Sequence, residues 1–252
     1  MEREHIYLSS IGADACACAQ AFGLGVELAQ FCTARNMDEG FDEVKDDLAR
    51  CRAATKRLTL HAPFNELTPA AIDPLVLRVS EHRWTQAVEL AARLEIKTVI
   101  VHAGFVPLVY YPEWFVARSA EFWRAFLPRV PDGMTLCLEN VMEPSADMLV
   151  EIVRQAGSEK LRLCLDVGHA NTMVSKEPVA VWLQKSAPYL AHVHVHNNDG
   201  TMDLHQPLDG GVLDMKDILT RLGALAPQAG VTLELMQCRS SVEWLLEQGL
   251  LQ

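Results

Sequence analysis

The chain has 252 residues, half of them hydrophobic, and a formal net charge of −11 at pH 7. This length and composition suit one large α/β domain or two small ones. The negative charge disfavours broad binding to nucleic acid, which requires clustered lysine and arginine opposite phosphates, although multivalent cations would cancel it locally. No apolar run reaches the length of a membrane span, so we expect none.

The N-terminus and the cysteines bear on the compartment. The first residues, MEREHIYLSS, lack the apolar segment of a signal peptide. The seven cysteines are odd in number, and no pair has the C-x-x-C spacing of a metal site. Most cysteines stand in apolar runs, as Cys137 and Cys164 do. We therefore expect reduced, buried thiols and a soluble cytoplasmic protein.

Short β-like runs alternate with amphipathic helical patterns along the chain. The predicted strands cover residues 5–10, 25–31, 58–64, 98–104, 135–141, 161–169, 191–198 and 231–236. The predicted helices cover residues 74–95, 113–130, 145–157, 213–226 and 241–251. Ser145 begins one of these helices, and Ser240 or Ser241 is expected to begin the last, because serine favours helix N-termini.

Eight β-then-α units in about 250 residues predict a (β/α)8 TIM barrel, an α/β fold, forming a single domain over residues 1–252. A doubly wound open sheet is the alternative. That fold favours a glycine-rich turn after its first strand. The segment SSIGADACA has a single glycine there, which makes the open sheet the weaker interpretation.

Polar side chains that can ligate metals follow six consecutive apolar strands. In a barrel the carboxyl ends of all strands lie on one rim, where active sites form, so we expect these side chains to converge. A single histidine or carboxylate at a strand end is usually structural, but six in a row favour a metal site. The strand ends outside the seventh strand contribute His61, His102, Glu139, Asp166 with His169 after it, and Glu234.

The seventh strand and the loop after it add further donors. His192, His194 and His196 share one face of the strand, since side chains alternate along it. His192 lies deepest and is expected to form an interior hydrogen bond rather than bind metal. Asp203 and His205 follow with a chelating spacing. Carboxylate oxygens and neutral imidazoles bind Zn, Mn or Co, so the rim predicts one to three divalent ions per chain.

The motifs HAPF, HAG, ENV, DVGHAN, HVHNNDG, DLHQPLDGG and ELM together resemble the xylose-isomerase-like TIM-barrel superfamily over residues 58–236. This superfamily contains sugar-phosphate isomerases and epimerases, together with the endonuclease IV enzymes of DNA repair. The resemblance therefore implies a metal-dependent enzyme built on the predicted barrel.

Two metal sites follow from the resemblance. The isomerase branch implies one ion held by Glu139, Asp166, His194 or His196, and Glu234. Both histidines stay open, with His194 slightly favoured, because HVHN and HNND each fit the His-x-x-Asp pattern of the family in part. The endonuclease IV branch implies a three-zinc cluster, and this chain has a suitable residue at each of its nine ligand positions: His61, His102, Glu139, Asp166, His169, the strand-seven histidine, Asp203, His205 and Glu234.

The resemblance favours a divalent-metal-dependent sugar or sugar-phosphate isomerase/epimerase acting through an enediolate. Glu139 and Glu234 would be catalytic, one removing a proton and the other returning it. The alternative is a multi-zinc phosphoesterase resembling endonuclease IV (AP endonuclease), from which the segments FNEL and ENVMEP depart. Asn140 and Arg239 are the candidate substrate-binding residues.

The expected partner is a small-molecule carbohydrate substrate rather than nucleic acid or a membrane, and a homo-oligomer is left open. A barrel that binds a ligand without catalysis is a third interpretation, which the complete set of nine donors disfavours.

Overall fold

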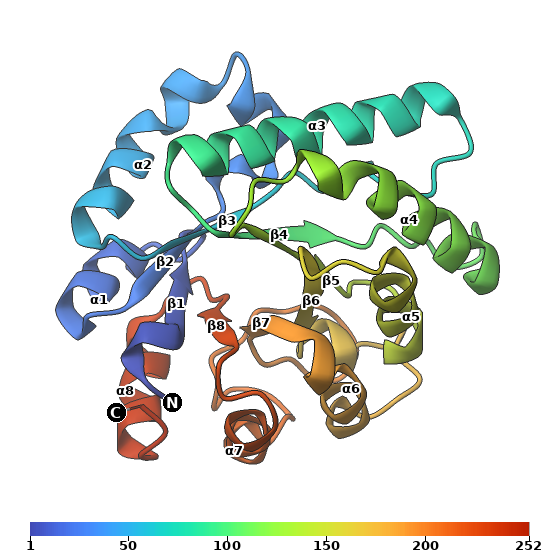
Figure 1. The fold of residues 1–252 in the computed structure, drawn as a ribbon. Coiled ribbons are helices and arrows are strands. Elements are labelled where there is room, and N and C mark those ends of the chain that lie inside the picture. The colour runs from blue at the N-terminus through green and yellow to red at the C-terminus, as the bar shows by residue number, and fades with distance from the viewer. Residues whose placement is uncertain (252) are drawn as a thin grey trace.

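Eight parallel strands close into a barrel surrounded by helices, which confirms the predicted (β/α)8 architecture (Figure 1). The computed structural model describes residues 1–251. The strands follow one another around the barrel in chain order, and β8 pairs with β1 to close it. Their bounds are β1 Ile6–Ser9, β2 Gly25–Leu28, β3 Leu58–His61, β4 Thr98–His102, β5 Thr135–Glu139, β6 Leu161–Asp166, β7 Leu190–Val195 and β8 Gly230–Leu233.

The helices pack outside the strands (Figure 1), and the Met1 ammonium donates to the Leu250 carbonyl at 2.6 Å, which joins the start of the chain to the segment after α8. Within residues 1–251, no helix combines the length and hydrophobicity needed to cross a bilayer. The α-helices are α1 Ala15–Phe22, α2 Phe41–Ala54, α3 Pro74–Arg93, α4 Pro112–Phe126, α5 Ala146–Ala156, α6 Val179–Ser186, α7 Met215–Leu225 and α8 Arg239–Glu247. Short 3₁₀ helices are η1 Arg3–His5, η2 Gln30–Cys32, η3 Ala34–Met37, η4 Leu127–Arg129, η5 His169–Asn171 and η6 Ala187–Tyr189.

Three helices, α1, α2 and α6, were not predicted. Helices α1 and α6 have eight residues each, too few for a clear period of 3.6 residues. Helix α2 is rich in charge, and its buried residues are only Leu48 and Cys51, so it carries almost no apolar stripe. These helices are stabilised by packing against the strands of the barrel.

The predicted start of α8 at Ser240 or Ser241 is wrong. The helix begins at Arg239, and the backbone N–H groups of Cys238 and Arg239 donate to the Asp14 carboxylate at 2.7 and 3.0 Å. An acceptor more than two hundred residues away therefore satisfies this helix end, which no local pattern indicates.

The core has an apolar outer layer and a partly polar barrel interior. Trp84, Trp123 and Trp182 are buried between helices and strands. A small apolar cluster inside the barrel comprises Ile100, Cys137 and Cys164. All seven cysteines are free thiols, and five of them are buried. The interior polar residues lie closer to the carboxyl ends of the strands, where they support the site.

Strand register sets the neighbours on the rim. His102 at the end of β4 pairs with Glu139 at the end of β5, and Asp166 at the end of β6 pairs with His194 of β7. Side chains at paired positions of parallel strands point to the same face of the sheet. The register thus brings two imidazoles and two carboxylates into the barrel mouth.

Candidate metal centre

The Glu139 carboxylate lies at the centre of the mouth, between residues of three other strands. Its Oε2 is 3.3 Å from Nε2 of His61 and 3.4 Å from Nε2 of His102. Its Oε1 is 3.2 Å from Nδ1 of His194. Oε2 is buried and accepts no hydrogen bond from the described residues. The two oxygens of one carboxylate therefore face two different groups of donors.

His194 lies where three carboxylates meet. Its Nδ1 is 3.2 Å from Glu139 Oε1, 3.4 Å from Glu234 Oε2 and 3.8 Å from Asp166 Oδ2. The carboxylates come from three different strands or strand ends, so the cluster exists only in the closed barrel. These four side chains are the set that the family resemblance implies for one ion, and their role as its ligands stays a prediction.

A second group of imidazoles surrounds Asp203. Its Oδ2 is 3.3 Å from Nε2 of His169 and 3.1 Å from Nε2 of His205, and its Oδ1 is 3.4 Å from Nε2 of His196. His196 Nε2 also lies 3.2 Å from Oδ1 of Asp166. The sequence left His194 and His196 as alternatives, and the structure brings both into the cluster at different places.

The loop after β7 returns to the mouth because a small ladder closes it. Asn197 and Gln206 exchange backbone hydrogen bonds of 2.9 and 2.8 Å, which brings Asp203 and His205 back over the strands. Gly168 lets His196 lie against the β6 end, because a Cβ atom at this position would overlap the imidazole ring. These two local features position the Asp203 group.

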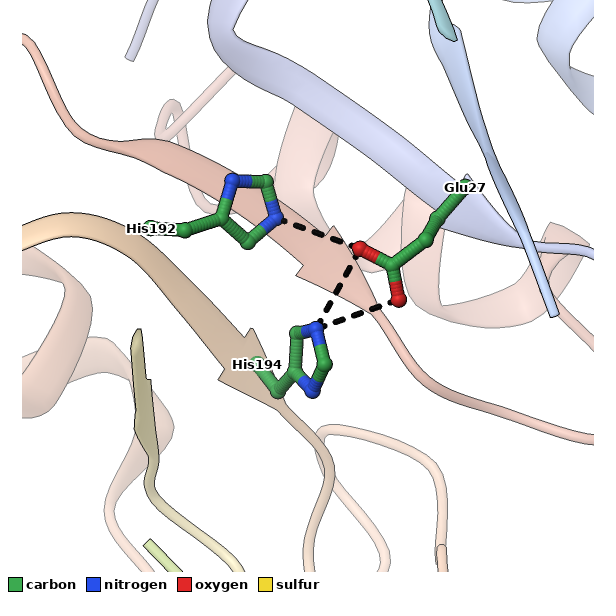
Figure 2. Close-up of side chains that lie close together, drawn as sticks. All are labelled: Glu27, His192 and His194. Atoms are coloured by element: carbon green, nitrogen blue, oxygen red, sulfur yellow. Dashed lines mark hydrogen bonds and ion pairs between the residues drawn. The ribbon is translucent and has the colours of Figure 1, made fainter. Parts of the chain in front are cut away.

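Glu27 of β2 is a buried site residue that the sequence analysis missed. Figure 2 shows its carboxylate facing the rings of both His192 and His194. Oε1 is 3.1 Å from Nε2 of His194, and Oε2 accepts hydrogen bonds from Thr232 at 2.9 Å and Thr59 at 3.2 Å. A glutamate within the apolar strand GVEL was the available signal.

Glu27 and His192 support the cluster from inside the barrel. His192 Nε2 and Thr232 Oγ1 are hydrogen-bonded at 2.7 Å, the interior contact expected of His192. Gly230 makes room for this ring, since a Cβ atom there would come too close to it. The Glu27 carboxylate can hold the proton of His194 on Nε2, which leaves Nδ1 free to bind a cation.

The electrostatics of the cluster favour cations. Burial opposes ionisation of Glu139 and Asp166, but nearby histidines, His194 for Glu139 and His169 for Asp166, hold the pKa of both carboxyls below the usual range. Burial lowers the pKa of His102 to about 3, so this imidazole is neutral and can act as a ligand. The centre thus presents anionic oxygens together with the neutral His102 imidazole.

The donor set fits divalent metal ions. Several buried polar atoms have no hydrogen-bond partner among the described residues, although buried polar groups are normally satisfied. Groups of three donors lie with their ligand atoms within 4.8 Å of one another, a separation that one ion can span. The unsatisfied atoms at the centre are Glu139 Oε2, Asp166 Oδ2, His196 Nδ1 and Nε2, and Glu27 Oε1.

The two candidate substrate-binding residues have other contacts. The side chain of Asn140 donates to the backbone oxygen of Asp166 at 2.9 Å and accepts from its N–H at 2.8 Å. The Arg239 guanidinium lies over the Phe22 ring and 3.5 Å from Glu243, both on helices outside the barrel. Substrate binding by either residue stays a prediction that would require these contacts to change.

Glu143, in the loop after β5, is expected to make the stability of the protein depend on pH. Its Oε2 accepts from the Val141 N–H at 2.7 Å, while Oε1 is buried without a partner among the described residues. Burial raises the Glu143 pKa from 4.5 to about 7. The folded state therefore binds a proton that the unfolded state has released, and stability falls as pH rises between these values.

We expect Glu143→Gln to remove this contribution. In metal-free protein, the free energy of unfolding of the variant relative to wild type should rise by about 3 kcal/mol between pH 4.5 and pH 7.5. Urea unfolding at several pH values measures the free energy of unfolding of both proteins. The contributions of the other carboxylates cancel in the difference between the two. Parallel stability curves for the two proteins would contradict the buried, protonated state of Glu143.

Comparison with known proteins decides the family. A family model described as the xylose isomerase-like TIM barrel matches residues 18–248. The chain belongs to this family. An uncharacterised protein of Methanocaldococcus jannaschii is 27% identical over 195 residues, which are 74% of this chain and 67% of that protein.

Two similar proteins with solved structures share the whole barrel. The structure of a Thermus thermophilus protein soaked with zinc chloride has a TM-score of 0.77 and 26% identity, and the match covers 98% of this chain and 97% of that one. A D-tagatose 3-epimerase-like protein has a TM-score of 0.75 and 23% identity, with 97% and 96% covered. The xylose isomerase-like resemblance of the sequence is thereby confirmed.

Proposed function

We propose that this family member hydrolyses phosphate esters with the help of two or three divalent metal ions. The position of the Glu139 carboxylate carries the proposal. Because one oxygen faces His61 and His102 and the other faces His194, this side chain would bridge two ions. Bridging carboxylates are typical of multinuclear hydrolytic centres rather than of sites for one ion.

The number of converging donors supports the same function. One ion takes three or four protein ligands, and the mouth holds more than twice that number. An isomerase with one ion would leave the Asp203 group and the His61–His102 pair without a role in metal binding. The proposed ligands are His61, His102, Glu139, Asp166, His169, His194, Asp203, His205 and Glu234, with His196 beside Asp166 and Asp203.

The side chains of the centre would have different roles in hydrolysis. Ions held here would supply Lewis acidity, which acidifies bound water and stabilises negative charge on phosphate oxygens. Glu139 and Asp166 would neutralise the ions and fix their spacing. Asp203 and His205 are the more exposed donors, so they would hold a cation where an incoming ester can reach it. Glu27 would orient His194 from behind.

A sugar isomerase or epimerase is the second candidate. The quartet of Glu139, Asp166, His194 and Glu234 supports it, since these side chains by themselves could hold one ion. The structural likeness to a D-tagatose 3-epimerase-like protein points the same way. In this function Glu139 and Glu234 would exchange the substrate proton from opposite sides of the sugar.

Metal content tests the proposal. We expect purified protein, or protein reconstituted with Zn or Mn, to hold two or three ions per chain by elemental analysis. The loaded protein should hydrolyse bis-p-nitrophenyl phosphate, and a chelator should abolish this activity and lower the melting temperature. One ion per chain, together with interconversion of ketose epimers, would instead support the isomerase.

A double substitution separates the two candidates. Asp203→Asn with His205→Gln alters the outer group and leaves the quartet around His194 intact. For the hydrolase we expect the loss of one ion per chain and a fall in hydrolysis of about 100-fold or more. An isomerase that uses the quartet alone would keep its single ion. Glu247→Gln, an exposed change at the end of α8, is the matched control.

A further inference from the structure

A cleft opens beside the donor cluster, between the loops that follow β3, β4 and β5. Its volume is about 410 Å³, within the range of small-molecule binding sites. Most of its lining is apolar or aromatic. The apolar and aromatic residues of the lining include Phe64, Leu67, Phe105, Val106, Tyr110 and Met142.

His102 joins the cleft to the candidate metal centre. One edge of its ring lies in the cluster, with Nε2 3.4 Å from Glu139 Oε2. The face of the same ring stacks on Phe64, with ring centroids 4.2 Å apart and planes inclined by 16°. A group bound in the cleft would therefore lie directly next to the reacting group of a ligand held by the cluster.

The cleft is formed in advance by packed aromatic side chains. Phe105 is buried and packs edge-on against Phe115 at 5.1 Å, and Tyr110 stacks on Trp114 at 5.7 Å. Phe105, Tyr110 and Met142 also line an adjoining cleft of about 480 Å³. The apolar surface thus extends away from the cluster on a supported loop rather than ending at the barrel mouth.

Exposure and charge indicate what this surface binds. Val106 and Met142 line the cleft and are each 44% exposed, so its apolar surface is accessible to a ligand. The ionisable groups that line the cleft beside the cluster, apart from Tyr110, are Glu66 and His102, so it offers almost no cation to a second anionic group. A neutral aromatic or branched aliphatic group matches this lining.

We propose that the substrate is a phosphate ester with a bulky apolar arm, which lies in this cleft while the phosphate reaches the donor cluster. The presence of a phosphate in the substrate rests on the proposed hydrolase function. The apolar arm is inferred separately, from the lining of the cleft. It distinguishes the substrate from a small free sugar, which is polar over its whole length.

Paired phosphonates test the inference by calorimetry on zinc-loaded protein. 1-Naphthylmethylphosphonate and methylphosphonate carry the same anionic group, and we expect the naphthyl compound to bind about 30-fold more tightly, because its rings leave water. The double variant Val106→Ser, Met142→Ser should lose most of this advantage. Met173→Ser, which changes an exposed methionine of the β6–α6 loop, should retain it.

Each outcome bears on one of the two proposals. Equal affinity for the two phosphonates, or a naphthyl advantage that survives in the double variant, would overturn the apolar-arm inference. 1-Naphthalenemethanol, which lacks the phosphonate, isolates the cleft and should bind chelator-treated protein more weakly in the double variant than in wild type. If it does so while zinc adds nothing to phosphonate binding, the cleft stands and the hydrolase function fails.

Discussion

Glu139→Gln is expected to reduce phosphate ester hydrolysis by roughly 1,000-fold or more, on the scale of other essential catalytic groups. The amide keeps the shape of the side chain but loses the charge that faces His61, His102 and His194. An amide oxygen is a poor bridge between ions. We therefore expect zinc content to fall to one ion per chain or less, measured by elemental analysis after dialysis.

Glu247→Gln is the control for the loss of one negative charge, since this glutamate is exposed at the end of α8. It should keep both metal and activity. The far-ultraviolet circular dichroism of both variants should match wild type, because a glutamine at position 139 fills the same space. Wild-type zinc content in Glu139→Gln would rule out Glu139 as the bridge and remove the main support for a multinuclear centre.

Glu27→Gln is expected to lower zinc affinity by about 10- to 100-fold, although Glu27 is not a proposed ligand of the centre. The carboxylate lies 3.1 Å from Nε2 of His194, on the side of the ring opposite the cluster. Its charge makes Nδ1 more basic and fixes the proton on Nε2. Glutamine can still accept the hydrogen bonds of Thr59 and Thr232, so the barrel should fold.

Two measurements distinguish this positioning role from a structural one. Competition with a chromophoric chelator gives the change in affinity, and nitrogen NMR of zinc-loaded protein reports the hydrogen bond at Nε2 of His194. With zinc on Nδ1, both proteins should carry the proton on Nε2, and Glu27→Gln should show a weaker hydrogen bond at this atom. An unchanged affinity together with an unchanged Nε2 signal would leave Glu27 as a packing residue.

Much of the fold could be predicted from the sequence, because strands and helices are indicated by patterns among neighbouring residues. Alternation within each strand and the repeated β-then-α order indicated eight units, and the structure contains all eight strands. The helices with strong apolar stripes were predicted as well. The polar, charge-rich α2 was missed because its two buried residues mark too little of a face. The start of α8 was missed because Asp14 supplies its cap.

Part of the candidate site could also be predicted from the sequence. Parallel strands in a barrel end on one rim, so donors at their ends could be expected to meet, and the structure brings them together. Their role as metal ligands stays a prediction. The choice between His194 and His196 could not be made from spacing, because both point to the same face of β7.

Residue types, their spacing and the order of strands and helices were determined by the sequence alone, since each depends on neighbours along the chain. Tertiary structure decided which atoms face one another. Glu139 has histidines at both oxygens, and Glu27 reaches across the barrel interior to His194, only because closure between β1 and β8 sets distances among residues far apart in sequence. Hydrogen bonds and ion pairs form only when two atoms lie within a few ångströms of each other in space. The periodicity of a sequence carries no information about the distances between atoms of remote residues.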